Sequence, residues 1–130
     1  MSSSSSTILA VDDRIDNLFV LKEVFAQFLP SCTLLTATSA EEGLAIASSQ
    51  SLKGAILDVQ MPGMDGFEAT RRIRDPETNV LNHDIPVIAV TANARKEDAE
   101  KCFAAGMTAY VSKPINPGEL KLAMENVRQG

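Results

Sequence analysis

The stretch Ile56-Leu57-Asp58-Val59-Gln60-Met61-Pro62-Gly63 places a single carboxylate between a short apolar run and a Pro-Gly turn. The apolar residues before the acid are typical of a buried strand, and the Pro-Gly pair after it is typical of a loop. A charge at the end of a core strand is costly to bury unless other groups compensate it. We therefore expect Asp58 to share its end of the strand with polar or charged partners.

Four more segments have the character of the run before Asp58 and predict further strands. All are apolar and rich in β-branched residues. Together with residues 54–57, they cover residues 7–11, 33–37, 86–90 and 108–111. Short apolar runs of this kind are typical of strands buried on both faces of a parallel sheet. We expect five fully buried strands.

Helical patterns lie between and after these strands. Apolar residues recur at helical spacing in two places, at Leu18, Leu21, Phe25 and Phe28 and at Leu120, Met124 and Val127. Asp65 and Glu68 have the spacing of an N-cap and its N3 partner, which predicts a helix from Asp65 to about Arg74. Strands that alternate with helices in this way predict an α/β protein with a doubly wound parallel sheet and helices on both faces.

Residues 75–84 predict a surface loop. They are polar, and the Asp75-Pro76 pair at their start ends the preceding helix. The only histidine of the chain, His83, lies in this segment and is expected to be solvated.

Length and composition indicate one domain. The chain has 130 residues, of which 45% are hydrophobic, enough for one packed core with little room for a second. We assign residues 7–130 to this domain. The serine-rich residues 1–6 are interpreted as a flexible tail or an expression remnant.

Composition also argues against several classes of function. Seventeen acidic residues against twelve basic ones give a net charge of -5, so direct nucleic-acid binding is not expected. Cys32 and Cys102 lie far apart, which indicates neither a zinc site nor a disulfide scaffold. No apolar segment approaches the roughly 20 residues that span a bilayer, and no signal peptide is recognisable. We expect a reduced, cytoplasmic protein with no membrane segment in this chain.

Polar side chains follow four of the five predicted strands. Asp12 and Asp13 follow the first strand, Asp58 the third, Thr91 the fourth and Lys113 the fifth. Because the carboxyl ends of parallel strands meet at one edge of the sheet, these side chains should converge there. Each has an ordinary explanation alone, as a turn residue, a helix cap or a loop lysine. Their joint placement at one edge predicts a functional site.

The residue types at this edge indicate phosphoryl-transfer chemistry. Clustered carboxylates repel one another unless a cation lies among them. Oxygen ligands without histidine or cysteine favour a hard ion, for which Mg²⁺ is the first candidate and Mn²⁺ the second. Lys113 and Thr91 are donors suited to an incoming phosphoryl group. Asp58, alone on its strand, can act as a nucleophile and form an aspartyl phosphate.

Four motifs together give the chain a resemblance to a known family. They are Val11-Asp12-Asp13, Asp58-Val59-Gln60-Met61-Pro62-Gly63-Met64-Asp65-Gly66, Thr91-Ala92 and Tyr110-Val111-Ser112-Lys113-Pro114. From Ile8 to about Val127 the sequence resembles the receiver domain of two-component response regulators. The resemblance implies a (βα)5 flavodoxin-like fold with strand order 2-1-3-4-5. It also implies that Asp58 accepts a phosphoryl group from the phosphohistidine of a sensor kinase or phosphotransfer domain.

The resemblance further implies roles for individual residues. Asp13, Asp58 and the backbone carbonyl of Gln60 would bind Mg²⁺, with Asp12 acting largely through water. Lys113 would contact the phosphoryl group and Thr91 would hydrogen-bond it. Movement of Thr91 would let Tyr110 rotate and change the face formed by the fourth helix, fifth strand and fifth helix. The Lys113-Pro114 bond is usually cis in this family.

Two other functions compete with a signalling domain that assists only its own phosphorylation and dephosphorylation. One is a small Mg²⁺-dependent phosphohydrolase that uses an aspartyl phosphate. Such enzymes carry a DxD motif after the first strand, whereas this chain has adjacent acids there. The other is a flavodoxin-like cofactor carrier, in which Asp12 and Asp13 would repel the flavin phosphate. The resemblance leaves open whether the chain is a stand-alone regulator or the receiver of a hybrid histidine kinase, with a slight preference for the latter.

Overall fold

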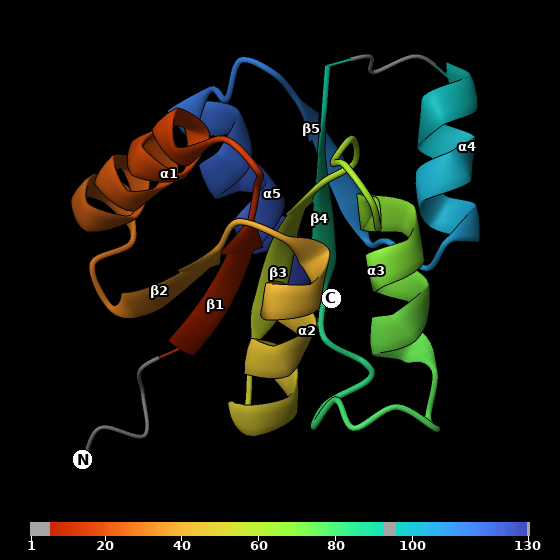
Figure 1. The fold of residues 1–130 in the computed structure, drawn as a ribbon. Helices are drawn as coiled ribbons and strands as arrows, with labels where there is room; N and C mark the ends of the chain where they lie inside the picture. The colour runs from red at the N-terminus through yellow and green to blue at the C-terminus, as the bar shows by residue number, and fades with distance from the viewer. Residues whose placement is uncertain (1–5, 93–95, 130) are drawn as a thin grey trace.

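The computed structural model describes residues 6–92 and 96–129, in which five parallel strands alternate with five helices (Figure 1). The strands are β1 (Ser6–Val11), β2 (Cys32–Ala37), β3 (Gly54–Asp58), β4 (Val87–Thr91) and β5 (Ala109–Ser112). The helices are α1 (Ile15–Phe28), α2 (Ala40–Ser49), α3 (Gly66–Arg74), α4 (Lys96–Ala104) and α5 (Pro117–Gln129). The sheet order β2-β1-β3-β4-β5 confirms the expected topology. Of the expected 1–6 tail, residues 1–5 lie outside the described part and Ser6 already belongs to β1.

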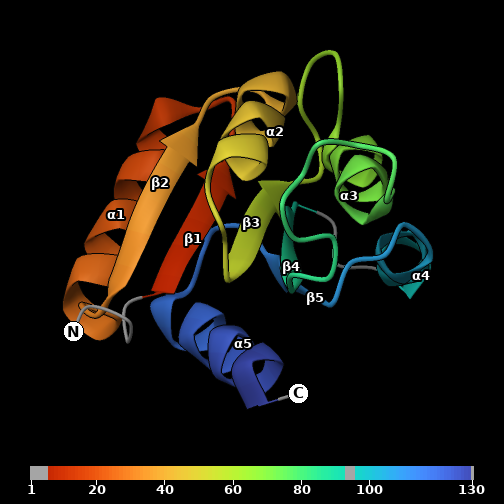
Figure 2. The same cartoon turned by 90° about the horizontal axis from the view of Figure 1, so that it is seen from below.

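Helices cover both faces of the sheet (Figure 2), and the sheet separates two apolar cores. Helices α2, α3 and α4 contribute to the core on one face, and α1 and α5 contribute to the core on the other. Alternate residues of β3 serve the two sides, with Leu57 in the first core and Ile56 in the second. This period of two is what a strand covered on both faces requires.

The expectation that all five strands are fully buried is wrong for β2 and β5. Every residue of β3 and β4 is buried, whereas Thr33 of β2 and Tyr110 of β5 are exposed. These two strands are the edges of the sheet, so each has a neighbouring strand on one side only. An edge strand therefore tolerates polar and partly solvated side chains that a central strand does not.

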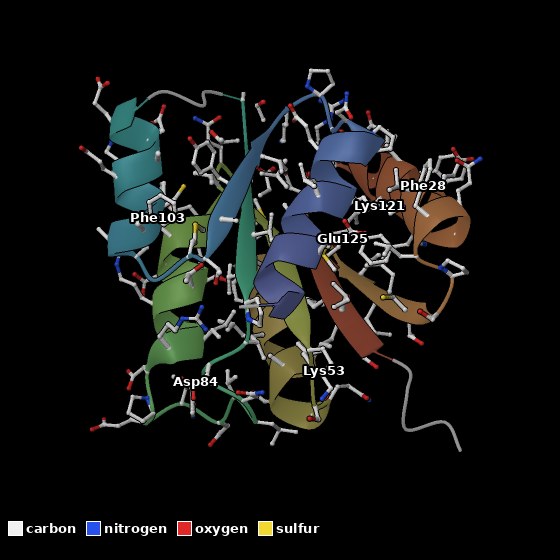
Figure 3. The ribbon with its side chains drawn as sticks, turned by 180° about the vertical axis from the view of Figure 1, so that it is seen from behind. Phe28, Lys53, Asp84, Phe103, Lys121 and Glu125 are labelled. Atoms are coloured by element: carbon white, nitrogen blue, oxygen red, sulfur yellow. The ribbon has the colours of Figure 1, made fainter. Side chains whose placement is uncertain are left out.

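The predicted apolar face of α1 is correct for three of its four residues. Leu18, Leu21 and Phe25 are buried, but Phe28 is 44% exposed. Phe28 is the last residue of the helix, and its ring lies on the surface beneath the ammonium of Lys121 of α5, 6.0 Å from the ring centroid (Figure 3). In α5, Leu120 and Met124 are buried as expected, and the side chain of residue 127 lies outside the described part.

Helix α3 begins as predicted. The Asp65 side chain accepts a hydrogen bond from the Glu68 backbone N–H at 2.9 Å, and the helix ends at Arg74. Glu68 does not complete a reciprocal cap: its carboxylate pairs instead with Arg71 and Arg72 on its own helix. These exposed pairs contribute little to stability.

The loop at residues 75–84 is more firmly attached than expected. His83 is half-buried rather than solvated, with Nδ1 at 2.8 Å from the Ile73 carbonyl oxygen. Its own carbonyl accepts a 2.8 Å hydrogen bond from Arg74, whose guanidinium also donates to the Gly106 carbonyl at 3.0 Å. Arg74 thus connects α3 to two loops at the amino-terminal edge of β4 and β5.

Among the described residues, no helix combines the length and apolar character needed to cross a bilayer.

Candidate functional site

The polar residues predicted to converge do lie at the carboxyl edge of the sheet, the upper ends of the strands in Figure 1. Asp12 and Asp13 directly follow β1, and Asp58 is the last residue of β3. One carboxylate oxygen from each lies within 4.8 Å of the others. The structure therefore brings together three acids that are up to 46 positions apart in the sequence, counted from Asp12 to Asp58.

Asp58 is almost completely buried, and each of its oxygens has a donor. Oδ1 accepts a hydrogen bond from the Gln60 backbone N–H at 3.1 Å, and Oδ2 accepts one from Lys113 Nζ at 3.0 Å. The side chain of Asp58 is 2% exposed, while that of Lys113 is 24% exposed. The pair with Lys113 offsets part of the desolvation free energy that burying the Asp58 carboxylate at the end of a core strand costs.

Asp12 is equally buried and is fixed from two directions. Its Oδ1 accepts the Arg14 backbone N–H at 2.9 Å, and its Oδ2 accepts Asn17 Nδ2 at 3.1 Å. Lys113 Nζ lies 3.9 Å from the same Oδ2. Burial raises the pKa of Asp12, and the nearby Asp58 charge adds to that effect, while the hydrogen bonds and Lys113 oppose it.

Asp13 is exposed and marks the solvent side of the cluster. The three carboxylates and the Lys113 ammonium leave two negative charges uncompensated. Carboxylate oxygens with that charge balance fit a hard divalent cation. The residues of the site therefore suit the metal expected from the sequence.

Thr91 and Lys113 are held beside each other by the backbone. The Lys113 N–H donates to the Thr91 carbonyl at 2.8 Å, and the Thr91 side chain is buried. The Lys113-Pro114 peptide bond is cis. The structure thus places Thr91 at the end of β4 and Lys113 directly after β5, with the Lys113 ammonium next to Asp58.

Gln60 and Tyr110 are both exposed at the surface. Gln60 is exposed and lines a groove of about 560 Å³, together with Met61, Phe67, Thr91 and Lys101. Tyr110 is 36% exposed, and its ring meets Phe103 of α4 edge-on, with centroids 6.1 Å apart and planes at 70°. The Tyr110 ring is therefore partly exposed and lies against α4 in this structure.

No sequence pattern indicated a role for Asn17 or Gly66. Gly66 N donates to the Val59 carbonyl at 3.0 Å, and a Cβ at this position would overlap the Asp58 carbonyl oxygen. Gly66 was part of a recognised motif, so its presence was visible but its contact was not. For Asn17, an amide in the first turn after the acidic pair was the only available signal.

Acids, a lysine and a threonine at the carboxyl edge of a five-stranded sheet define an α/β protein of the doubly wound class, with its polar site at the ends of the strands. The family model of the response regulator receiver domain matches residues 8–125. The chain belongs to this family, which confirms the resemblance seen in its motifs.

Curated relatives support the same assignment. The chain is 38% identical over 117 residues to hybrid signal transduction histidine kinase L of Dictyostelium discoideum, which covers 88% of this chain and 7% of that protein. It is 35% identical over 126 residues to sensor histidine kinase RcsC of Escherichia coli, covering 94% of this chain and 12% of that protein. The chain thus spans only about an eighth or less of the length of these two relatives.

Solved structures share the fold. Chemotaxis protein CheY4 of Vibrio cholerae superposes with a TM-score of 0.85 at 27% identity, covering 95% of this chain and 99% of that one. The receiver domain of a sensor histidine kinase from Pseudomonas aeruginosa gives a TM-score of 0.83 at 28% identity, covering 98% of this chain and 100% of that one. The latter structure is described as having a magnesium ion coordinated in its active site cleft.

Proposed function

We propose that this receiver domain accepts a phosphoryl group on Asp58 in a Mg²⁺-dependent reaction and passes the signal on by a change of shape. The observation that carries the proposal is the environment of Asp58, a buried carboxylate bonded to Lys113 at 3.0 Å and clustered with two further acids. A buried acid within such a group is poised for nucleophilic chemistry that needs charge neutralisation.

The donor is proposed to be a phosphohistidine. A lone pair on an Asp58 carboxylate oxygen forms the new O–P bond while the P–N bond breaks, and its electron pair returns to the imidazole nitrogen. Lys113 Nζ, already at Asp58 Oδ2, can follow the negative charge onto the phosphoryl oxygens. The Thr91 hydroxyl is proposed to donate to one of those oxygens. In the separate dephosphorylation step, a water oxygen forms a bond to phosphorus while the Asp58 O–P bond breaks, which releases inorganic phosphate and restores the carboxylate.

Asp12, Asp13, Asp58 and the backbone carbonyl of Gln60 are the proposed metal ligands, with Asp12 acting through water. When bound, Mg²⁺ or Mn²⁺ would neutralise charge on the transferring group. Both Asp12 oxygens already accept hydrogen bonds from Arg14 and Asn17, which supports an indirect role for this acid.

The proposed output is a rearrangement of the face formed by α4, β5 and α5. Drawing the Thr91 hydroxyl towards the phosphoryl group would open space for the Tyr110 ring, which now lies outward against Phe103. The proposed partners are a histidine kinase or a histidine phosphotransfer domain. Relatives that are histidine kinases support this choice of partner.

Phosphorylation with a small donor tests the proposal. Incubation with acetyl phosphate and Mg²⁺ should add one phosphoryl group to the intact protein, as a base-labile adduct seen by mass spectrometry. Asp58→Asn should abolish the adduct, because the amide is a poor nucleophile. Asp65→Asn is the matched control, since Asp65 lies in the same loop but serves as the cap of α3.

The same experiment separates signalling from enzymatic activity. A wild-type protein that gains no adduct, or gains it equally in the Asp58→Asn variant, would overturn the proposal. Sustained turnover of a small phosphoester would favour a phosphohydrolase. Because Tyr110 is the only tyrosine and the chain has no tryptophan, its fluorescence should change on phosphorylation if the ring moves.

A further inference from the structure

We propose that Asn17 is a positioning residue that orients Asp12 for metal binding while leaving its negative charge available. The inference rests on the function proposed above and adds to it a residue on α1. Asn17 Nδ2 donates to Asp12 Oδ2 at 3.1 Å, and Asn17 itself is half-buried in the first turn of the helix.

The two oxygens of Asp12 are held by different elements. Oδ1 accepts the Arg14 N–H, which belongs to the same short loop and fixes only one end of the carboxylate. Oδ2 is held by Asn17, which projects from the helix that follows. Loss of the second bond would leave the carboxylate with the Arg14 N–H as its one remaining hydrogen-bond donor of this pair, so that rotation about its Cβ–Cγ bond is less restricted. Asn17 therefore sets the direction in which Asp12 presents its second oxygen to the cluster.

A neutral donor has a specific advantage at this position. Lys113 Nζ is 3.0 Å from Asp58 Oδ2 but 3.9 Å from Asp12 Oδ2, so the ammonium is drawn mainly to Asp58. Because Asn17 occupies Asp12 Oδ2 without contributing positive charge, it orients Asp12 and leaves its attraction for a cation intact. Because Asn17 already donates a hydrogen bond to Asp12 Oδ2, Asp12 competes less strongly for the Lys113 ammonium, which favours the position of that lysine beside Asp58.

Removal of the Asn17 amide should change both the orientation and the effective charge of Asp12. In Asn17→Ala, Asp12 can turn towards Lys113, and the carboxylate is then neutralised in part by the ammonium. Residues that orient metal ligands typically change metal affinity by about 10- to 100-fold when they are removed. We therefore expect the dissociation constant of Asn17→Ala for Mg²⁺ to exceed that of the wild type by a factor of this size.

Calorimetric titration of the folded, metal-free protein with MgCl₂ measures this constant directly. A second readout is the Mg²⁺ concentration that half-saturates phosphorylation by acetyl phosphate. That concentration should rise in Asn17→Ala, whereas the rate at saturating Mg²⁺ should stay close to that of the wild type. A purely structural role for Asn17 would instead lower stability and leave Mg²⁺ affinity unchanged.

Two variants of the same helix serve as controls. Val24→Ala removes a buried apolar side chain from α1 and tests whether loosening the helix is enough. Gln27→Ala removes an exposed amide from α1. Both should retain wild-type Mg²⁺ affinity. The inference is overturned if Asn17→Ala binds Mg²⁺ as the wild type does, or if Val24→Ala weakens binding equally, and either result leaves the proposed function standing. Failure of the wild type itself to bind Mg²⁺ would overturn both.

Discussion

At the scale of single residues, the geometry of Asp58 depends on Gly66, the first residue of α3. The β3 strand and the start of α3 approach so closely that the Gly66 N–H donates to the Val59 carbonyl. A Cβ at residue 66 would overlap the Asp58 carbonyl oxygen and lie 3.0 Å from Val59 Cα. Because these neighbours are backbone atoms, no side-chain rotation can relieve the overlap.

Gly66→Ala should therefore damage both stability and the site. Overpacking of this kind costs about 1–3 kcal/mol in free energy of unfolding, which urea denaturation measures. The displaced backbone should also weaken Mg²⁺ binding and slow phosphorylation, since Asp58 and Gln60 flank the point of contact.

The control for this prediction is Gly54→Ala, at the other end of β3. Its Cβ would lie 3.3 Å from Ile8 Cδ1, the flexible end of a side chain, and 3.5 Å from the Pro86 carbonyl oxygen. We expect a smaller loss of stability and unchanged Mg²⁺ affinity. Equal effects of the two substitutions on Mg²⁺ binding would show that the contact of Gly66 with Asp58 is not the cause.

At the scale of elements, α4 and β5 are linked by one aromatic pair. Phe103 and Tyr110 meet edge-on with centroids 6.1 Å apart, and both are partly exposed. Pairs of this geometry stabilise by about 0.5–1.5 kcal/mol beyond burial. In the proposed switch, the pair would favour the outward position of Tyr110 and so oppose the phosphorylated arrangement.

Phe103→Leu should therefore increase affinity for beryllofluoride, a phosphoryl analogue, in the presence of Mg²⁺. Loss of the pair corresponds to about a two- to tenfold increase, and linkage requires the same factor in the switching equilibrium. The midpoint of a titration followed by Tyr110 fluorescence gives the affinity. Phe19→Leu is the control, because Phe19 is a similarly exposed aromatic residue on α1. An unchanged or weaker affinity in Phe103→Leu would contradict the prediction.

At the amino-terminal edge of the sheet, opposite the acids, Arg74 attaches α3 to its neighbours. Arg74, at the end of α3, donates to the carbonyls of His83 and Gly106, and burial lowers the pKa of its guanidinium. This contact joins α3 to the loops that precede β4 and β5. The end of the domain remote from the acids is therefore held by hydrogen bonds that a partly buried cation donates, while the opposite edge carries the carboxylates.

At the scale of the whole molecule, the two cores give its two cysteines different chemistry. Cys102 of α4 is 1% exposed, and burial raises the pKa of its thiol above the ordinary value of 9.0, with Asp98 adding to the effect. Cys32, at the start of β2, is only partly buried. The unfolded chain loses the Cys102 proton at lower pH than the folded chain does. This group therefore makes the free energy of unfolding fall as the pH rises above about 9.

Iodoacetamide should distinguish the two thiols at pH 8. Cys102 should react far more slowly in the folded protein than in urea, because the thiolate is the nucleophile and the sulfur is inaccessible. Peptide mass mapping follows both sites in one sample, with Cys32 as the internal comparison. A Cys102 that reacts at the same rate in folded and unfolded protein would show that α4 does not keep it buried.

Local patterns in the sequence determined most of the fold. Apolar runs predicted all five strands to within a residue or two, and the Asp65–Glu68 spacing correctly located the start of α3. The convergence of Asp12, Asp13 and Asp58 was also predictable, because parallel strands must present their carboxyl ends at one edge. These features depend on periodicity, caps and topology, all of which are encoded over short stretches of chain.

Tertiary structure determined which residues of separate elements contact one another. The hydrogen bond from Asn17 to Asp12, the overlap that forbids a side chain at Gly66 and the attachment of His83 to α3 depend on how separate elements pack. The exposure of Phe28 and of the edge strands likewise depends on where neighbouring elements end. Sequence determined which chemical groups reach the edge of the sheet, because strand direction alone carries them there. Packing decided their orientation, because angles and distances between side chains are set by contacts that no local pattern specifies.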